Sequence, residues 1–228
     1  MEPLIIRLAL ATPVIPGPRL TLDAVLAAAL YRETGDLSAA HDDLPLARSD
    51  GVPQASQAFI EEPARWLPIQ ASRRLQTTGP IAVGPRTPAI RRASGPYRNR
   101  VTDYVAAATP AVWWQAHGDR AEIEATLNSL MGVGTKATHG WGEIKGWDVW
   151  PARADHPGWL DTEGTPLRPV PVHSWTAAGL SLDTRVIDVE TWRPPYWRRD
   201  DAIPCVVPPA EDPQDPRRLF ARLGDCNG

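Results

Sequence analysis

The segment LMGVGTKATHGWGEIKGWDV, residues 130–149, contains Lys136 and His139 among five glycines: Gly132, Gly134, Gly140, Gly142 and Gly146. Glycine adopts positive φ freely and lets another backbone approach closely. A loop of this composition can turn its amides toward an anion and form a nest for phosphate. The loop is therefore a candidate site for binding a phosphate or another anion. The alternative is a tight turn whose glycines serve packing alone.

The same loop contains His139, the best candidate for a catalytic group. A histidine of near-neutral pKa can deprotonate a 2′-hydroxyl or protonate a leaving oxygen during RNA cleavage. No second histidine is close by, and His41 and His117 are more distant candidates. Because a lone histidine in a turn more often has a structural role, we predict no catalytic residue. The alternative is an endoribonuclease that uses His139.

Other catalytic and metal-binding patterns are not evident. The glycine segment lacks GxxxxGK[ST] and follows a predicted helix, whereas Walker A and Rossmann loops follow a strand. Adjacent carboxylates, as in Asp42-Asp43 and Glu61-Glu62, diverge in a strand or a helix, so we expect solvated charges there. Cys205 and Cys226 have neither CxxC spacing nor a companion histidine pair. We predict reduced thiols, no metal and no cofactor.

A second segment carries positive charge that no acidic residue offsets. Residues 65–100 contain no Asp or Glu, and their arginines are Arg65, Arg73, Arg74, Arg86, Arg91, Arg92, Arg98 and Arg100. Such a run is expected where a protein neutralises phosphates and displaces their counterions. It favours a nucleic-acid partner even though the net charge of the whole chain is −3. The alternative is a solvated basic face.

The strands that must position these segments follow from apolar runs and alternation. We predict strands at residues 4–11, 52–60, 67–71, 101–115, 143–150 and 202–207. The strands at 52–60 and 67–71 are expected to form a hairpin. Residues 77–99 are rich in Gly, Pro and Arg without periodicity, which predicts an extended excursion.

Two helices are predicted from apolar periodicity and capping signals. The first begins after Thr21 as its cap and ends at Gly35, with Asp23 in the favourable first turn. The second runs over residues 119–131, where Asp119 and Glu122 make a capping-box-like pair and Gly132 supplies the stop.

The order of these elements over residues 1–150 predicts an α+β protein with a ferredoxin-like core, in which two helices pack on one face of an antiparallel sheet. Residues 151–228 are rich in Pro and Trp and predict a C-terminal elaboration packed on that core. Trp113 and Trp114 should face opposite sides of a strand, which leaves one available for RNA or a partner. Core packing is expected for Trp141, Trp147 and Trp150. The segment WRPPYWRR, residues 192–199, could grip nucleic acid or a neighbouring subunit.

The glycine segment resembles the glycine-rich loop of the RAMP superfamily of CRISPR proteins. There, a hydrophobic-GxGxxxxxGxG pattern lies between the second helix and the last strand of a ferredoxin-like fold. Met131-Gly132-Val133-Gly134 and Gly140-Trp141-Gly142 match this pattern. Two stretches, LTLDAVLAAAL and LPLARSDGVPQASQAF, resemble those of the Cas-five-like subunit of type IV CRISPR effector complexes. The resemblance covers about residues 1–150.

The resemblance implies a non-catalytic subunit of a ribonucleoprotein. Such a subunit caps the 5′ handle of the CRISPR RNA, contacts the backbone-forming subunit and, in some systems, approaches the motif that flanks the DNA target. Family members often carry a thumb or β-hairpin, which we place at the basic excursion, residues 77–100. Arginines would contact phosphates, Tyr97 would stack on an unpaired base, and the loop would hold the RNA backbone. The expected RNA-binding residues are Arg73, Arg74, Arg91, Arg92, Tyr97, Arg98, Arg100, Gly132, Gly134, Lys136, His139, Gly140 and Gly142.

Composition is that of a soluble globular protein, with 43% hydrophobic and 22% charged residues. No stretch approaches the roughly 20 apolar residues of a membrane span, and the start lacks the features of a signal peptide. We therefore predict a cytoplasmic protein without a membrane partner. The ten tryptophans also allow a scaffold protein without RNA contact, since Trp is enriched at buried interface anchors.

Overall fold

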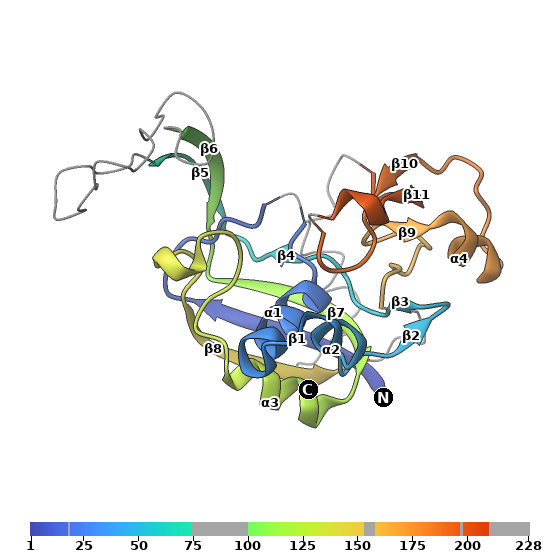
Figure 1. The fold of residues 1–228 in the computed structure, drawn as a ribbon, viewed down its shortest axis with the longest axis horizontal. Helices are drawn as coiled ribbons and strands as arrows, with labels where there is room; N and C mark the ends of the chain where they lie inside the picture. The colour runs from blue at the N-terminus through green and yellow to red at the C-terminus, as the bar shows by residue number, and fades with distance from the viewer. Residues whose placement is uncertain (18, 74–99, 153–157, 197, 210–228) are drawn as a thin grey trace, which may run out of the picture.

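The main sheet has four strands and is the centre of the fold (Figure 1). The computed structural model describes residues 1–17, 19–73, 100–152, 158–196 and 198–209, and within them the chain is an α+β protein with several antiparallel sheets. The order of the main sheet is β4-β7-β1-β8, with all neighbours antiparallel. Its strands are β1 (Glu2–Leu10), β4 (Phe59–Ile60), β7 (Ala111–Gly118) and β8 (Ile144–Pro151).

Strand β1 lies inside the sheet because it is apolar on both faces. Leu4, Ile6 and Leu8 are buried on one face, and Ile5 is buried on the other. A strand of this kind needs cover on both sides of the sheet. The strand predicted at residues 4–11 is thus confirmed, and so is the one predicted at 143–150, which is β8.

Helices cover the face of the sheet that carries Leu4, Ile6 and Leu8. The covering helices are α1 (Leu22–Thr34) and α3 (Arg120–Asn128), and the short α2 (Leu37–Asp42) packs against α1. Leu26 of α1 and Leu127 of α3 belong to the same buried cluster as these β1 side chains. Along the chain, α1 lies between β1 and β4, and α3 connects β7 to β8. Both predicted helices are therefore confirmed.

The helix ends differ in part from the sequence predictions. Gly35 ends α1 in the left-handed region, and Asp119 caps α3 by accepting a hydrogen bond from the Glu122 amide, as predicted. Thr21 occupies the N-cap position of α1, but its side chain makes no capping hydrogen bond. Gly132 does not end α3, because the helix already stops at Asn128. The loop after α3 is therefore longer than predicted.

A long two-stranded hairpin extends from the main sheet (Figure 1). It consists of β5 (Arg65–Arg73) and β6 (Arg100–Ala108), which pair in register along their whole length. The predicted hairpin between residues 52–60 and 67–71 is therefore wrong. Short alternating runs do not determine a strand's partner, because long-range burial decides it.

The remaining strand predictions fall near these elements. Residues 52–60 form β3 (Val52–Pro53), which pairs with β2 (Arg48–Ser49), and β4, which joins the edge of the main sheet. The strand predicted at 101–115 is divided between β6 and β7. The excursion predicted at 77–99 lies outside the described residues.

The C-terminal part forms a smaller sheet in the order β10-β11-β9. Its elements are β9 (Val170–Pro171), α4 (Val172–Ala177), β10 (Ile187–Glu190) and β11 (Ile203–Val206), the last of which confirms the strand predicted at 202–207. Trp159, Trp175 and Val206 share a buried cluster with Val52 of the N-terminal part. Cys205 of β11 is buried, and burial raises the pKa of its thiol to about 11.

The segment that leads into this sheet covers the second face of the main sheet. Leu167 packs with Ile5 and Trp113, and the Gln115 side-chain amide donates to the carbonyls of Gly158 at 2.9 Å and Leu160 at 2.6 Å. Trp113 and Trp114 lie on opposite faces, as predicted, but neither is free for a ligand. Trp113 is 6% exposed and Trp114 0%.

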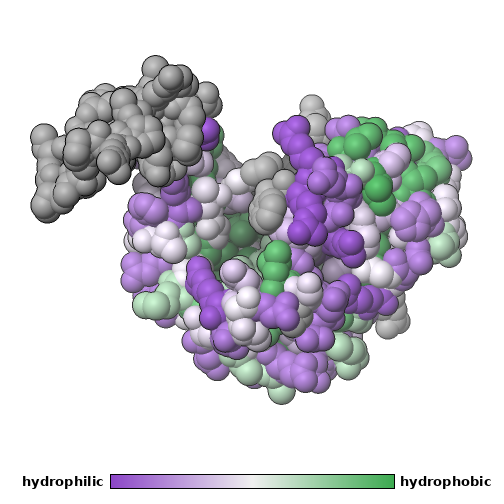
Figure 2. All heavy atoms as spheres, in the orientation of Figure 1, coloured by the Kyte–Doolittle hydropathy of each residue, from purple (hydrophilic) through white to green (hydrophobic). Residues whose placement is uncertain are grey.

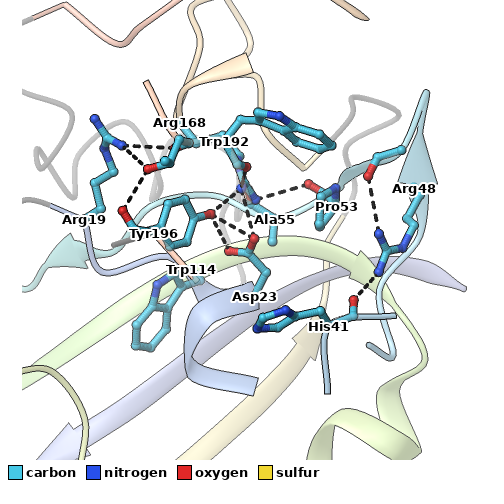
Figure 3. Close-up of polar contacts among 12 residues, drawn as sticks. Arg19, Asp23, His41, Arg48, Pro53, Ala55, Trp114, Arg168, Trp192 and Tyr196 are labelled. Atoms are coloured by element: carbon cyan, nitrogen blue, oxygen red, sulfur yellow. Dashed lines mark hydrogen bonds and ion pairs between the residues drawn. The ribbon is translucent and has the colours of Figure 1, made fainter. Parts of the chain in front are cut away.

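A fully buried ion pair joins the C-terminal part to α1 (Figure 3). The Arg168 Nη2 atom lies 2.9 Å from the Asp23 Oδ2 atom, and neither side chain has any exposed surface. The Tyr196 hydroxyl donates to the same carboxylate at 2.9 Å. Arg168 also donates to the carbonyls of Pro53 and Trp192. Burial alone would lower the pKa of Arg168, but the interactions with Asp23, Tyr196 and Cys205 together outweigh burial, so the pKa is raised.

Replacing Arg168 by methionine should lower the free energy of unfolding by roughly 3–5 kcal/mol, because Asp23 would keep its buried charge without a partner. Chemical denaturation at pH 7 measures the change. The control is Arg120→Met, which removes a solvent-exposed ion pair with Glu124 and should change the stability little. Equal effects of the two substitutions would contradict the importance of the buried pair. Adding Asp23→Leu to Arg168→Met should recover much of the loss.

Candidate nucleic-acid interface

The glycine-rich loop joins α3 to β8 and is tied to the segment that follows β1. The Thr135 amide donates to the Ile15 carbonyl at 2.8 Å, and the Gly142 amide donates to the Pro13 carbonyl at 2.8 Å. Within the loop, the Val133 amide donates to the Gly142 carbonyl at 2.9 Å. These three amides therefore hydrogen-bond to the protein itself, and they are not the ones that would form a nest for an anion.

Two glycines of the loop are required by close approach of other backbone. A Cβ atom at Gly142, whose φ is +62°, would lie 2.1 Å from the Val133 carbonyl oxygen. A Cβ atom at Gly134, whose φ is +86°, would lie 2.7 Å from the Ile15 carbonyl oxygen. Gly140 has φ +84° but open space around it. Packing thus explains Gly134 and Gly142, whereas Gly140 is needed only for its backbone conformation.

Lys136 and His139 lie on the outer side of this loop, around the short 3₁₀ turn Ala137–His139. Lys136 has φ +65°, and its Nζ atom lies 6.0 Å from the centre of the Tyr104 ring on β6. The loop therefore reaches the basic hairpin. His139 is exposed, and its Nδ1 atom lies 3.1 Å from the Thr138 Oγ1 atom. No carboxylate of the described residues lies within 4 Å of its ring.

The loop borders two hollows that share Arg19 and Thr135. The smaller one, of 230 Å³, has an apolar wall from α1 and also includes Arg32. The larger one, of 870 Å³, extends to β10 and includes Tyr196 and Arg199. Figure 2 shows a hollow between the side that carries β5 and β6 and the side that carries the C-terminal sheet, with hydrophilic residues along the latter. We call these two hollows together the loop groove.

The charge of the loop groove comes from residues far apart in the sequence. Arg19 is neutralised by Glu190 and also donates to the Thr191 carbonyl at 3.0 Å. Arg32 and Arg199 are exposed, and within the described residues no carboxylate lies within 4 Å of either guanidinium. With Lys136, they provide positive charge that can bind phosphates.

The predicted arginine site is described only at its margins. Arg73 and Arg100 are cross-strand partners at the outer end of the β5–β6 hairpin, and Arg100 is exposed. The other predicted contacts of this segment, Arg74, Arg91, Arg92, Tyr97 and Arg98, lie outside the described residues. Among the described residues, Lys136 and Tyr104 form a contact between the loop and the hairpin. Arg100 lies at the outer end of the hairpin, paired with Arg73.

The sequence did not indicate Arg19 or Arg32 as members of a site. Each is a single arginine without basic neighbours, so no run of positive charge pointed to it. Arg199 does belong to the WRPPYWRR segment that was singled out. In that segment Tyr196 is engaged with Asp23, so its hydroxyl serves the buried ion pair.

Two side-chain predictions need correction. Glu61 is not a solvated charge, because it accepts hydrogen bonds from the Arg7 Nε atom at 2.9 Å and from the Trp113 indole. Trp150 is not a core residue, because it is 38% exposed and stacks on Trp113 with ring centres 5.5 Å apart. Trp147, in contrast, packs against the main core as predicted.

No protein-family model matches this chain, and no curated protein does either. Among the described residues, no group of three or more His, Cys, Asp or Glu side chains could hold a metal ion. The helices described there are all too short or too polar to cross a membrane. A function for the chain therefore has to be inferred from its own geometry.

Replacing Gly142 by alanine should strongly lower the melting temperature, because the new methyl group would overlap the Val133 carbonyl. Gly140→Ala should cost only about 1–2 kcal/mol, since the site is open and the strain is confined to φ. The matched control is Gly146→Ala in β8, where nothing lies within 4 Å of the new Cβ atom and φ is not positive. Thermal unfolding of the three variants measures the order of their melting temperatures. If Gly142→Ala melts like Gly146→Ala, the loop is not packed as described.

Proposed function

We propose that this chain is a non-catalytic RNA-binding subunit of a type IV CRISPR ribonucleoprotein, which caps the 5′ handle of the CRISPR RNA and contacts the backbone-forming subunit. In the assembled complex it would also lie near the motif that flanks the DNA target. The observation that carries the proposal is the position of the glycine-rich loop, between α3 and β8 and beside both the basic hairpin and the loop groove.

The fold that we propose for this unit is a ferredoxin-like core. Such a core has a β-α-β-β-α-β chain order. The elements of this core follow one another as β1-α1-β4-β7-α3-β8, with α2, β2, β3, β5 and β6 inserted between them. This order, the sheet order β4-β7-β1-β8 and the packing of α1 and α3 in one buried cluster support the assignment. The loop after the second core helix is where the RAMP proteins that the sequence resembles carry their glycine pattern.

The loop groove offers chemistry that suits single-stranded RNA. Guanidinium groups make strong, charge-assisted hydrogen bonds to phosphates, and Arg32 and Arg199 are free to do so. The smaller hollow has an apolar wall that includes Ala24, Val25 and Leu130, against which an unpaired base could pack. Phosphate contacts would position the RNA, and base contacts would select the handle sequence.

The part played by the loop differs from the sequence expectation. Since the amides of Val133, Thr135 and Gly142 bond within the protein, we assign the RNA backbone contact to the Lys136 side chain. The glycines would act indirectly, by letting the loop pack tightly enough to hold Lys136 beside β6.

An endoribonuclease is the competing function, with His139 as its catalytic group. Acid-base cleavage requires a group that removes a proton and another that supplies one. The exposed His139 ring has the Thr138 hydroxyl beside it, and this hydroxyl is a poor base at neutral pH. This arrangement favours RNA binding without cleavage. A scaffold without RNA contact is the third candidate.

Purification of the protein together with the products of neighbouring genes should yield small RNAs that share a common 5′ end. Sequencing of the extracted nucleic acid tests this. The isolated chain should leave the matching repeat RNA intact. Cleavage that disappears in His139→Ala would instead establish an endoribonuclease, and the absence of any RNA would favour the scaffold.

Replacing Arg32, Lys136 and Arg199 together by glutamine should weaken RNA binding and reduce its salt dependence. Each lost phosphate contact lowers the slope of log affinity against log salt by about 0.7 for a single strand, so the slope should fall by about 2. The control replaces three charges outside the loop groove, Arg120, Lys145 and Arg185, and should leave the slope unchanged.

The same assay tests the basic excursion predicted at residues 77–100. A variant with alanine at Arg91, Arg92, Arg98 and Arg100 should bind RNA more weakly and with a smaller salt dependence. If affinity and slope stay unchanged in this variant and in the glutamine triple variant, neither surface is the RNA site.

A further inference from the structure

A second basic pocket lies beside the loop groove and has no place in the proposed RNA contact. The segment 191–202 contributes to both, because Tyr196 and Arg199 line the loop groove whereas Arg193 and Arg198 line the other pocket. The remaining wall of this pocket comes from α2 and from the β2–β3 hairpin, through His41 and Arg48. Its volume is 170 Å³, several times the roughly 30 Å³ of one water molecule in the liquid.

Three arginines line this pocket, and they come from two separate segments. Arg48 lies on β2, and Arg193 and Arg198 flank the two prolines at 194 and 195. The acidic residues at its wall are Asp42 and Asp201. Arg198 lies 4.0 Å from Asp201, but within the described part of the chain neither Arg48 nor Arg193 has a carboxylate within 4 Å. Positive charge in the pocket is therefore only partly offset.

Contacts within the protein hold two of these side chains in place. Arg48 donates from Nη2 to the His41 carbonyl (Figure 3) and to the Asp42 carbonyl, and from Nη1 to the Gly51 carbonyl. These bonds to neutral groups set its position without loss of its charge. The Arg193 guanidinium lies over the Trp192 ring, 5.3 Å from the ring centre. A ligand would meet side chains that are already oriented, which reduces the entropy lost on binding.

The pKa of His41 depends on the charge of the pocket. Burial lowers the pKa of its imidazole, Asp42 opposes this effect, and the positive charges of Arg193 and Arg198 lower the pKa further. The charged groups that face it are Asp42 on α2, Asp23 on α1, Arg48 on β2, and Arg193 and Arg198 of the C-terminal part. An anion bound among the arginines would favour the imidazolium and raise this pKa.

We propose that the pocket formed by His41, Arg48, Arg193 and Arg198 binds a tetrahedral oxyanion, chemically a phosphate group. One guanidinium can satisfy both oxygens of a carboxylate by a bidentate contact, whereas three guanidiniums match the larger number of oxygens on a phosphate. The binding of this group does not depend on the proposed RNA contact, because the loop groove is lined by other residues.

The titration of His41 by NMR tests the proposal on the full chain. The pKa of His41 should be higher in sodium sulfate than in sodium chloride or sodium acetate at equal ionic strength, and its signal is identified by its loss in His41→Gln. Sulfate is the probe because it does not titrate in this pH range. Arg193→Gln and Arg198→Gln should each weaken sulfate binding about tenfold or more, as expected for the loss of one charge-assisted hydrogen bond.

The control Lys145→Gln removes an exposed charge of β8 outside the pocket and should leave the sulfate response unchanged. Since Arg193 and Arg198 are exposed, the variants should melt at the wild-type temperature. An identical His41 titration in all three salts would overturn the proposal, and an equal response to acetate would overturn its assignment to phosphate.

Comparison of inorganic phosphate with AMP separates two sources of the phosphate group. Tighter binding of AMP assigns the group to a nucleotide, and equal binding assigns it to free phosphate.

Discussion

The ion pair between Asp23 and Arg168 is the constraint on which the rest of the structure depends. Each charge would be costly alone in a site with no exposed surface, so the pair favours contact between α1 and the C-terminal part. The same guanidinium reaches the Trp192 carbonyl, and the same carboxylate accepts from the Tyr196 hydroxyl. The pair thereby places the segment 191–202, which contributes one wall to the loop groove and another to the oxyanion pocket.

In the glycine-rich loop, a packing requirement leaves particular groups for the proposed binding surface. Gly134 lets the loop approach the Ile15 carbonyl of the segment that follows β1, and Gly142 lets the loop fold closely onto its own Val133 carbonyl. Because the inward amides are used in that contact, the groups left for a ligand are side chains, chiefly Lys136 beside Tyr104. The two interpretations of the loop are therefore compatible. The glycines and backbone amides serve packing, whereas the Lys136 side chain is left for the proposed ligand.

Sequence patterns predicted the elements whose signals are local. The apolar run of β1, the Asp119 cap of α3 and the Gly35 end of α1 are each determined by a few neighbouring residues. The pairing of β5 with β6 was missed, because their partner residues are separated by a long stretch of chain that carries no periodicity. Arg168 was missed for a similar reason. Its partner Asp23 lies 145 residues away, and an arginine between prolines looks like an ordinary surface residue until the fold brings the two together.

This sequence separation also has a consequence for synthesis of the chain. Asp23 leaves the ribosome 145 residues ahead of Arg168, an interval of roughly 7–30 s at 5–20 residues per second. During that time α1 has a carboxylate on its inner face and no cation to neutralise it. The helix can dock fully on the nascent sheet only when the carboxylate stays hydrated or takes up a proton. Completion of the core therefore waits for the last third of the chain, and the protein matures late in translation.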